Sequence, residues 1–285
     1  MPQNDRAPAL TQSITRFSFT GAPEEGAREC AVEIPVNIVY APVPYAVMMA
    51  TPQDLEDFAL GFSVSEGVID GPSDIRSIVV EEAEQGLRVV VTLASEKLQR
   101  HLARTRNLAG RTGCGLCGVD DLCALPMARG PDHGPGHLKL SSVRRALLLL
   151  DERQTLNRRV RALHGAAWAD HSGELLLVRE DVGRHNALDK LIGALLGQGV
   201  DPASGFVVIT SRCSYEMVEK AAVFGARALV AVSAPTTLAI ARAKANAMTL
   251  MALARNDSAL CFTDPAFVID DLQDADVLAS GKGVL

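Results

Sequence analysis

The strongest constraint on the fold is a series of short apolar runs in the second half of the chain, each followed by a helical pattern. Residues 206–210 and 229–232 are almost entirely apolar, which is typical of strands in a sheet covered by helices on both faces. Helices are expected after them at 215–224 and 238–247. Further strands are expected at 160–169, 175–179, 249–253 and 259–262, and further helices at 143–154 and 186–196. Strands that alternate with helices predict an α/β domain with a mixed, mostly parallel sheet.

The first third of the chain predicts a smaller α+β unit. Apolar residues alternate with polar or small ones over 32–40, the period of a half-buried strand, and residues 46–50 can pair with it. Thr51 precedes a proline, so it is expected to be the N-cap of a helix that follows. Two more strands are expected at 75–80 and 87–93, then a helix at 95–106.

These patterns predict two folded parts joined by a linker. We expect residues 28–110 to form the N-terminal α+β subdomain and residues 138–270 to form the α/β domain. Residues 111–137 are expected to be a loop and linker, because Pro and Gly are frequent at 131–136. Residues 1–27 are expected to be a loose, disordered tail, and residues 271–285 a C-terminal tail.

Two cysteines, Cys114 and Cys117, stand among glycines in the segment Gly-Cys-Gly-Leu-Cys-Gly. Glycine neighbours leave a thiol accessible, whereas cysteine usually prefers burial. A series of basic residues leads into this segment, and positive charge lowers a thiol's pKa. The series comprises Lys97, Arg100, Arg104, Arg106 and Arg111. The pair therefore indicates metal binding, redox exchange or covalent sulfur carriage.

The metal and redox interpretations find less support nearby. Cys114, Cys117, His133 and His137 match a C-x2-C…H-x3-H zinc pattern. The two histidines lie in Pro-Asp-His-Gly-Pro-Gly-His, which cannot form the helical turn that this pattern needs. Zinc is therefore a minor alternative, and no resident metal is expected. A dithiol switch stays open, although no strand precedes the pair as in thioredoxin-like proteins.

Basic side chains follow two of the expected strands. Arg184 and His185 lie in the turn before one helix, and Arg212 lies in the turn before another. Ligands gather at the carboxyl ends of strands in open α/β sheets, and a helix N-terminus with an arginine suits a phosphate. These three residues are therefore candidate phosphate contacts. Helix capping and surface ion pairs are the alternative explanation.

Composition excludes several classes of protein. A net charge of −6 and a pI near 5.6 argue against a dedicated nucleic-acid binder. The polar start has no apolar signal-peptide region, and no stretch is apolar enough to span a bilayer. The six cysteines are sparse, unlike a secreted disulfide scaffold. A cytoplasmic protein with reduced thiols is expected.

Several motifs together resemble the FdhD/NarQ family of formate dehydrogenase accessory sulfurtransferases. The resemblance spans about residues 28–269, and its motifs follow the family order. They are Arg-Thr-Gly-Cys-Gly-Leu-Cys-Gly at 111–118, REDVGRHNALDK at 179–190, SYEMVEKA at 214–221, MMATP at 48–52 and FALGFSVSEGVI at 58–69.

The resemblance implies a cytidine-deaminase-like three-layer α/β/α domain with an added N-terminal subdomain. It does not imply deamination, because the zinc signature of those enzymes needs H-x-E and P-C-x-x-C. Here His164 is followed by Gly-Ala, and the segment around Cys213 lacks the proline and the second cysteine.

The resemblance also implies a role. A sulfurtransferase of this family would pass sulfur from a cysteine desulfurase to bis(molybdopterin guanine dinucleotide) molybdenum cofactor, which formate dehydrogenase needs. Cys114 would hold the persulfide and Cys117 would assist. The family's cofactor-binding segment falls on Leu253, Ala254, Arg255, Asn256, Asp257 and Ser258. A homodimer is also implied. The alternatives are a non-catalytic cofactor chaperone whose cysteines are structural or bind metal, and a zinc-dependent regulator.

Overall fold

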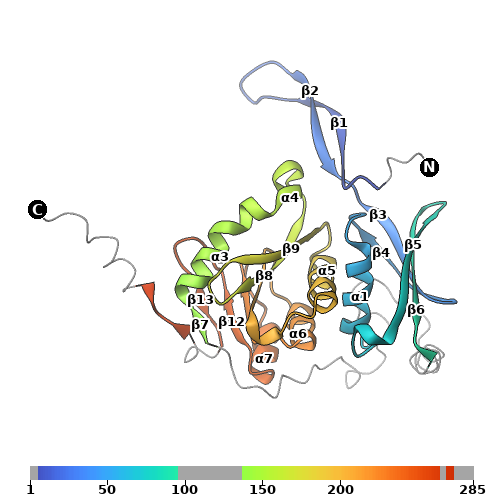
Figure 1. Cartoon of the computed structure of the whole chain (residues 1–285). Helices are drawn as coiled ribbons and strands as arrows, with labels where there is room; N and C mark the ends of the chain where they lie inside the picture. Colours follow the sequence, from blue (N-terminus) through green and yellow to red (C-terminus); the bar gives the residue numbers. More distant parts are fainter. Residues whose placement is uncertain (1–5, 96–136, 264–267, 273–285) are drawn as a thin grey trace, which may run out of the picture.

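The computed structural model describes residues 6–95, 137–263 and 268–272. Two parts, each built on its own sheet, lie side by side (Figure 1). Helix α1 (Leu55–Ser65) of the first part packs along α5 (Arg184–Gly197) of the second. The two parts therefore share a helix–helix interface.

The first part is a four-stranded sheet with one covering helix. Its strands are β3 (Ile34–Tyr40), β4 (Val43–Ala50), β5 (Ile75–Ala83) and β6 (Gly86–Leu93), in the order β4-β3-β6-β5. Only β3 and β6 pair in parallel. Alternate residues of β3, such as Val36 and Ile38, pack against Phe58 of α1. The expected α+β unit is therefore present.

The second part contains a six-stranded sheet. Its strands are β8 (His164–Asp170), β9 (Leu175–Asp181), β10 (Gly205–Ile209), β11 (Ala228–Ala231), β12 (Thr249–Ala252) and β13 (Leu260–Cys261). The order is β13-β12-β11-β10-β8-β9. Parallel pairing is limited to the central strands β10, β11 and β12. The remaining pairings, β8 with β9, β8 with β10 and β12 with β13, are antiparallel. Short connections can join antiparallel neighbours, as between β8 and β9. The sheet is mixed, as expected. A smaller share of its strand pairs is parallel than the sequence analysis predicted.

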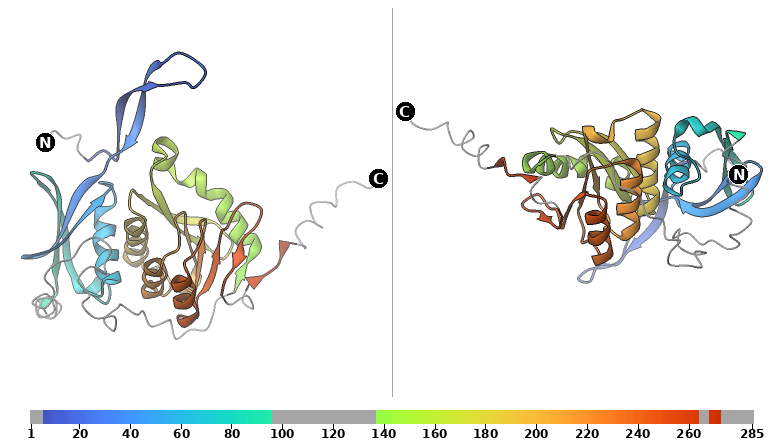
Figure 2. Two further views of the ribbon diagram at one scale, coloured as in Figure 1. Left: turned by 180° about the vertical axis from the view of Figure 1, so that it is seen from behind. Right: turned by 90° about the horizontal axis from the view of Figure 1, so that it is seen from below.

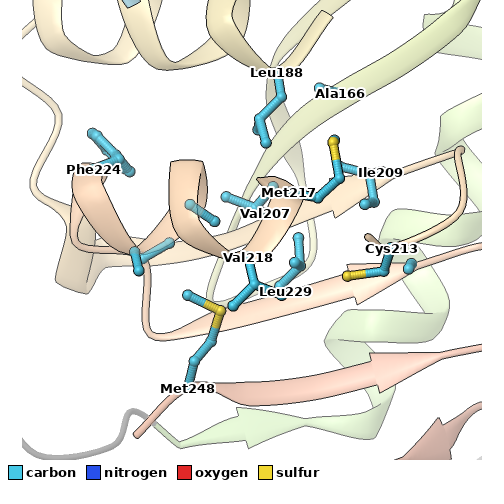
Figure 3. Packing of buried hydrophobic residues seen from close by; sticks show 14 of the residues in the cluster. Ala166, Leu188, Val207, Ile209, Cys213, Met217, Val218, Phe224, Leu229 and Met248 are labelled. Atoms are coloured by element: carbon cyan, nitrogen blue, oxygen red, sulfur yellow. The ribbon is translucent and has the colours of Figure 1, made fainter. Parts of the chain in front are cut away.

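Helices cover both faces of this sheet. Helices α5, α6 (Tyr215–Phe224) and α7 (Thr237–Ala245) pack on one face, and α3 (Leu140–Arg153) packs on the other (Figures 1 and 2). Strand β10 contributes Val207 and Ile209 to the first core and Val208 to the second. Figure 3 shows Val207 and Ile209 in the same cluster as Met217 of α6. Burial on both faces explains why the strands are apolar throughout.

Smaller elements complete the structure. Helix α4 (Thr155–Val160) follows α3, and β7 (Leu138–Lys139) pairs in parallel with β14 (Val268–Ile269). Two short 3₁₀ helices lie at Pro72–Asp74 and Pro202–Ser204. In the described part of the chain, no helix is both long and apolar enough to cross a membrane.

The N-terminal segment differs from the expectation. Residues that were expected to be a loose tail form a two-stranded antiparallel hairpin, β1 (Ala9–Arg16) and β2 (Glu24–Ala31). This hairpin, called the arm below, projects from the body of the molecule (Figures 1 and 2). Nearly all of its residues are exposed, so the sequence has none of the burial pattern by which strands are recognised.

Two local predictions were also wrong. Thr51 is not the N-cap of α1, because the helix begins after Asp54, whose φ is 53°. Strand β8 begins at His164 rather than at residue 160, because Val160 still belongs to α4. The helix expected at 95–106 and the loop and linker at 111–137 lie almost wholly outside the described residues, and the remaining domain boundaries stay predictions.

Candidate functional site

Four strands of the larger sheet end at one edge. Strands β10, β11 and β12 run parallel, so their carboxyl ends meet there. Strand β9 ends at the same edge because two antiparallel steps separate it from β10. Strand β8 begins there, and His164 pairs with Asp181 at the end of β9. This row of strand ends is called the carboxyl edge below. It is where ligands bind in open α/β sheets.

Backbone hydrogen bonds join the turns along this edge. The Cys213 N–H donates to the Ala234 carbonyl at 3.1 Å, and the Thr236 N–H donates to the Cys213 carbonyl at 3.0 Å. In the next turn, the Leu253 N–H donates to the Ser233 carbonyl at 3.1 Å. The turns after β10, β11 and β12 therefore form one connected surface.

The structure brings the three candidate phosphate contacts to this edge. Arg184 and His185 are the first residues of α5, and Arg212 lies between β10 and α6. Both arginines act on His164: burial lowers the pKa of its imidazole first, and the charges of Arg184 and Arg212 lower it further. The positive charges of two separate turns therefore act on the same imidazole at this edge.

Three buried polar atoms at this edge have no hydrogen-bond partner among residues 6–95, 137–263 and 268–272. They are Arg184 Nε, His185 Nε2 and Ser214 Oγ. Ser214 is the N-cap of α6, but its hydroxyl accepts no hydrogen bond from the helix backbone. Gly183 is the N-cap of α5 and has no side chain to accept one. Buried polar groups are normally satisfied, so such a cluster is a place for a ligand. Two open helix N-termini and an arginine favour an anionic one.

His185 is neutral in this environment. Burial lowers the pKa of its imidazole to about 4, and the charge of Arg184 adds to the effect. Glu216 lies 3.9 Å from Nε2 and acts in the opposite direction, but more weakly. A neutral imidazole can donate or accept one hydrogen bond at Nε2 without adding charge.

A buried ion pair fixes the turn that carries Arg184 and His185. Lys190 Nζ lies 2.7 Å from Asp181 Oδ2, and both side chains are 0% exposed. Asp181 also accepts from the N–H groups of Gly183 at 2.7 Å and Thr51 at 3.0 Å. Lys190 donates to the Thr51 carbonyl at 2.9 Å. Thr51 of the N-terminal part therefore takes part in holding the β9–α5 turn.

A second network reinforces the same interface one helical turn later. Asp189 accepts from Lys220 of α6 at 2.9 Å and from the Ser65 hydroxyl of α1. Asn186 donates to the Met49 carbonyl at 2.9 Å. Helix α5 is thus bound to the N-terminal part at several points, which makes the turn at its start rigid.

The model of the FdhD/NarQ family matches residues 31–269. This chain belongs to the FdhD/NarQ family. Relatives named sulfur carrier protein FdhD include one from Cupriavidus necator, 47% identical over 237 residues, which are 83% of this chain and 82% of the relative. Another, from Xanthomonas euvesicatoria, is 46% identical over 235 residues, 82% of this chain and 84% of the relative.

A solved structure has the same fold as this FdhD/NarQ chain. It is a candidate formate dehydrogenase accessory protein from Desulfotalea psychrophila, with a TM-score of 0.72 and 24% sequence identity. The match covers 92% of this chain and 100% of the other. The α/β architecture is confirmed by this likeness, whereas a specific relation to cytidine deaminases stays a prediction.

The segment that the FdhD/NarQ resemblance assigns to the cofactor lies at the same edge. Leu253, with φ of 52°, follows β12 directly. Ala254 is buried, whereas the residues after it are exposed: Arg255, Asn256, Asp257 and Ser258. The Arg255 N–H donates to the Ser258 carbonyl at 2.7 Å, and its guanidinium donates to the Val232 carbonyl. The loop is therefore closed on itself and tied to the neighbouring turn.

The two cysteines of the FdhD/NarQ motif, Cys114 and Cys117, lie outside the described residues. Among the described cysteines, Cys213 is fully buried, and burial raises the pKa of its thiol to about 12. Cys213 is therefore unsuited to thiolate chemistry.

Sequence reasoning missed the buried charges of α5. Asp189 and Lys190 stand in an otherwise apolar helix, Ala-Leu-Asp-Lys-Leu-Ile-Gly-Ala-Leu-Leu. Charges within an apolar run indicate burial with partners, since an unpaired buried charge is very costly. That signal was available, but the partners themselves were not, because Thr51 and Lys220 come from other elements.

Proposed function

We propose that this chain is a sulfurtransferase that carries sulfur as a persulfide on Cys114. The sulfur would come from a cysteine desulfurase and go to the molybdenum cofactor bis(molybdopterin guanine dinucleotide), as formate dehydrogenase activity requires. Membership of the FdhD/NarQ family and relatives named sulfur carrier protein FdhD support this role. A cytoplasmic location and a homodimer belong to the same proposal.

The observation that supports cofactor binding most directly is a set of buried donors at the carboxyl edge that no other described residue satisfies. The cofactor is rich in phosphate, so it is strongly anionic. Arg184 Nε, Ser214 Oγ and the open N-termini of α5 and α6 match that charge. The loop at 253–258, whose last four residues are exposed, adjoins the same edge and would contact the guanine end.

The chemistry at Cys114 is a sulfur exchange without net oxidation. The Cys114 thiolate attacks the terminal sulfur of the desulfurase persulfide. The bond between that sulfur and the desulfurase cysteine breaks, and this cysteine leaves as a thiolate. Release follows when the Cys117 thiolate attacks the inner sulfur of Cys114. A Cys114–Cys117 disulfide then forms and sulfide leaves, so a thiol reductant is needed before the next cycle.

Intact-mass spectrometry tests the carrier role. The protein is incubated with a cysteine desulfurase and cysteine, and a thiol-labile gain of one sulfur is expected. The gain should disappear in Cys114→Ala and persist in Cys30→Ala, a control at an exposed cysteine. In Cys117→Ala the persulfide should accumulate, because release is blocked. No gain in the wild type would support the chaperone alternative, and its zinc content would then be measured.

Calorimetry with GDP tests the binding site separately. GDP carries the guanosine and diphosphate groups of the cofactor. Arg184→Gln should weaken binding by about tenfold or more, the worth of a charge-assisted hydrogen bond. Arg227→Gln is the matched control, because Arg227 precedes β11 at the opposite edge of the same sheet. Equal GDP affinity in both variants would remove the carboxyl edge from the proposal.

A further inference from the structure

The imidazole of His185 lies at the carboxyl edge, because His185 is the second residue of α5. Its side chain is 22% exposed, but the Nε2 atom is buried and has no hydrogen-bond partner among the described residues. Arg184 Nε and Ser214 Oγ are in the same condition, and they come from two different helix starts. A titratable nitrogen therefore lies among the groups to which we assign the anion.

Two charged side chains of α6 act on this imidazole in opposite directions. Glu216 Oε2 lies 3.9 Å from Nε2 and favours a proton on the ring. Lys220 disfavours that proton, and the charge of Lys220 is only partly balanced by Asp189 at 2.9 Å and Glu66 at 3.8 Å. Helix α6 alone therefore provides no strong partner for a charged imidazole.

The neighbouring turns add mainly positive groups. Arg184 precedes His185 on α5 and opposes its protonation more strongly than Lys220 does. His164, at the start of β8, acts in the same direction. Arg212, in the turn before α6, acts in turn on His164. The empty edge is thus a cationic region in which a further positive charge is unfavourable.

Other carboxylates on the elements packed against α5 are engaged by other groups. Glu180 of β9 accepts from the first backbone N–H groups of α4. On α1, β9 and α6, three more form ion pairs: Asp57 with Arg179, Asp181 with Lys190 and Glu219 with Arg242. The charge that would balance a protonated imidazole must therefore come mainly from a bound molecule.

We infer that His185 takes up a proton from solvent when an anion binds at the carboxyl edge. The inference rests on the anion site proposed above and goes beyond it, because it makes the proton a second ligand of that site. An anion beside Arg184 balances the positive charges that oppose protonation. A protonated imidazole has an N–H at both ring nitrogens, so Nε2 donates a charge-assisted hydrogen bond to the anion. One N–H bond forms and no electron is transferred.

This proton uptake makes the affinity for anions depend on pH. The pKa of His185 in the empty site is about 4, and an opposite charge close to the ring raises a pKa by about 1–3. With a pKa of about 6 in the complex, the complex holds more protons than the free protein between these values. Affinity therefore rises as the pH falls, by about tenfold from pH 7 to pH 5. An uncharged ligand should show no such dependence.

NMR of the full chain with ¹³C-labelled histidine tests the inference. The imidazole signals are followed against pH in the free protein and with saturating sulfate, GDP or guanosine. The signal of His185 is identified by its loss in His185→Gln or, equally, in His185→Asn. Its pKa should rise by about 1 or more with sulfate and with GDP, and should not change with guanosine. Sulfate keeps the same charge between pH 5 and pH 7, so its effect cannot come from titration of the ligand.

His171 serves as the control within the same spectra. It lies in the turn between β8 and β9, at the opposite edge of the sheet, where its Nε2 is 2.9 Å from the Ala203 carbonyl oxygen. Its pKa should be the same with and without each ligand. An unchanged pKa of His185 at saturating sulfate and GDP, or an equal rise at His171, would overturn the inference.

Calorimetry with GDP measures the linkage itself. Titrations in buffers of different ionisation enthalpy count the protons taken up, and the wild type should take up about 0.8 more per GDP at pH 5 than His185→Gln. His171→Gln is the matched control and should behave like the wild type. Equal uptake in wild type and His185→Gln would overturn the inference but leave GDP binding, and the proposed function, intact. Conversely, a pKa rise with sulfate in a protein that does not bind GDP would support the inference and contradict the cofactor assignment.

Discussion

The β9–α5 turn and the start of α5 contain two kinds of buried polar groups, those with hydrogen-bond partners and those without a described partner. On the interface side, Asp181 and Lys190 bond to each other and to Thr51. On the side of the sheet edge, Arg184 Nε and His185 Nε2 have no hydrogen-bond partner within the part of the chain that the structure describes. Burial of a polar group is costly unless a hydrogen bond compensates for it. The first set therefore stabilises the fold, whereas the second is left ready for a ligand.

The interface also brings two helix backbones unusually close together. A Cβ at Gly61 would lie 1.8 Å from the Asp189 carbonyl oxygen, and one at Gly193 would lie 1.8 Å from the Asp57 carbonyl oxygen. Only glycine allows α1 and α5 to cross at this distance. The interface is thus defined by close backbone packing as well as by charge, while the sheet edge remains open.

The largest effect is expected from removing the buried lysine. Lys190→Met leaves Asp181 buried with no cation, which should lower the free energy of unfolding by about 3–5 kcal/mol. Urea denaturation measures the change. Adding Asp181→Asn removes the uncompensated charge and keeps one acceptor oxygen, so it should recover part of the loss. A loss below about 1 kcal/mol in Lys190→Met would mean that the interface tolerates the unpaired charge.

Overpacking the helix crossing should be nearly as damaging. Gly193→Ala forces α1 and α5 apart and should cost about 3 kcal/mol. Gly197→Ala is the matched control on the same helix, because its Cβ would meet only Leu60 Cδ2 at 3.9 Å. Alanine favours a helix over glycine, so the control should be neutral or slightly stabilising. Equal melting temperatures for the two variants would show that the crossing can relax.

The sequence predicted elements best where they are buried on both sides. Helix α6 spans the expected residues 215–224, and β10 and β11 lie within one residue of expectation. Continuous apolar runs and clear helix boundaries produce a strong local signal there. The arm gave no such signal, because exposed strands need no apolar alternation.

For the candidate site, the sequence predicted where the residues lie in the fold, but not which residues they contact. Arg184, His185 and Arg212 were expected in turns after strands, and they do lie at one edge. Thr51 was expected to cap a helix, but it bonds to Asp181 instead, 130 residues away. A capping preference is local, whereas that contact depends on how the two parts pack. Long-range partners of this kind leave no pattern in a single sequence.

A smaller and pH-dependent effect is expected at His185, on the unpartnered side of the turn. Its folded pKa is about 4, below the ordinary value of 6.5, because of burial and Arg184. Between these values the unfolded chain binds a proton that the folded chain does not, so stability falls as the pH falls. From pH 7 to pH 5 the loss should be about 2 kcal/mol. His185→Gln should lack this component. Parallel stability curves for the two proteins from pH 7 to 5 would argue against a buried neutral imidazole.

The smallest effect is expected at an exposed ion pair. Asp151 and Arg161 are 3.4 Å apart, and their side chains are 71% and 58% exposed. Water screens such a pair, so Asp151→Asn should change the free energy of unfolding by less than about 0.5 kcal/mol. This pair, like Asp181 and Lys190, joins a carboxylate to a basic side chain, but it is exposed, so the contrast tests the effect of burial. If Asp151→Asn cost as much as Lys190→Met, charge pairing alone, and not its place at the interface, would determine stability.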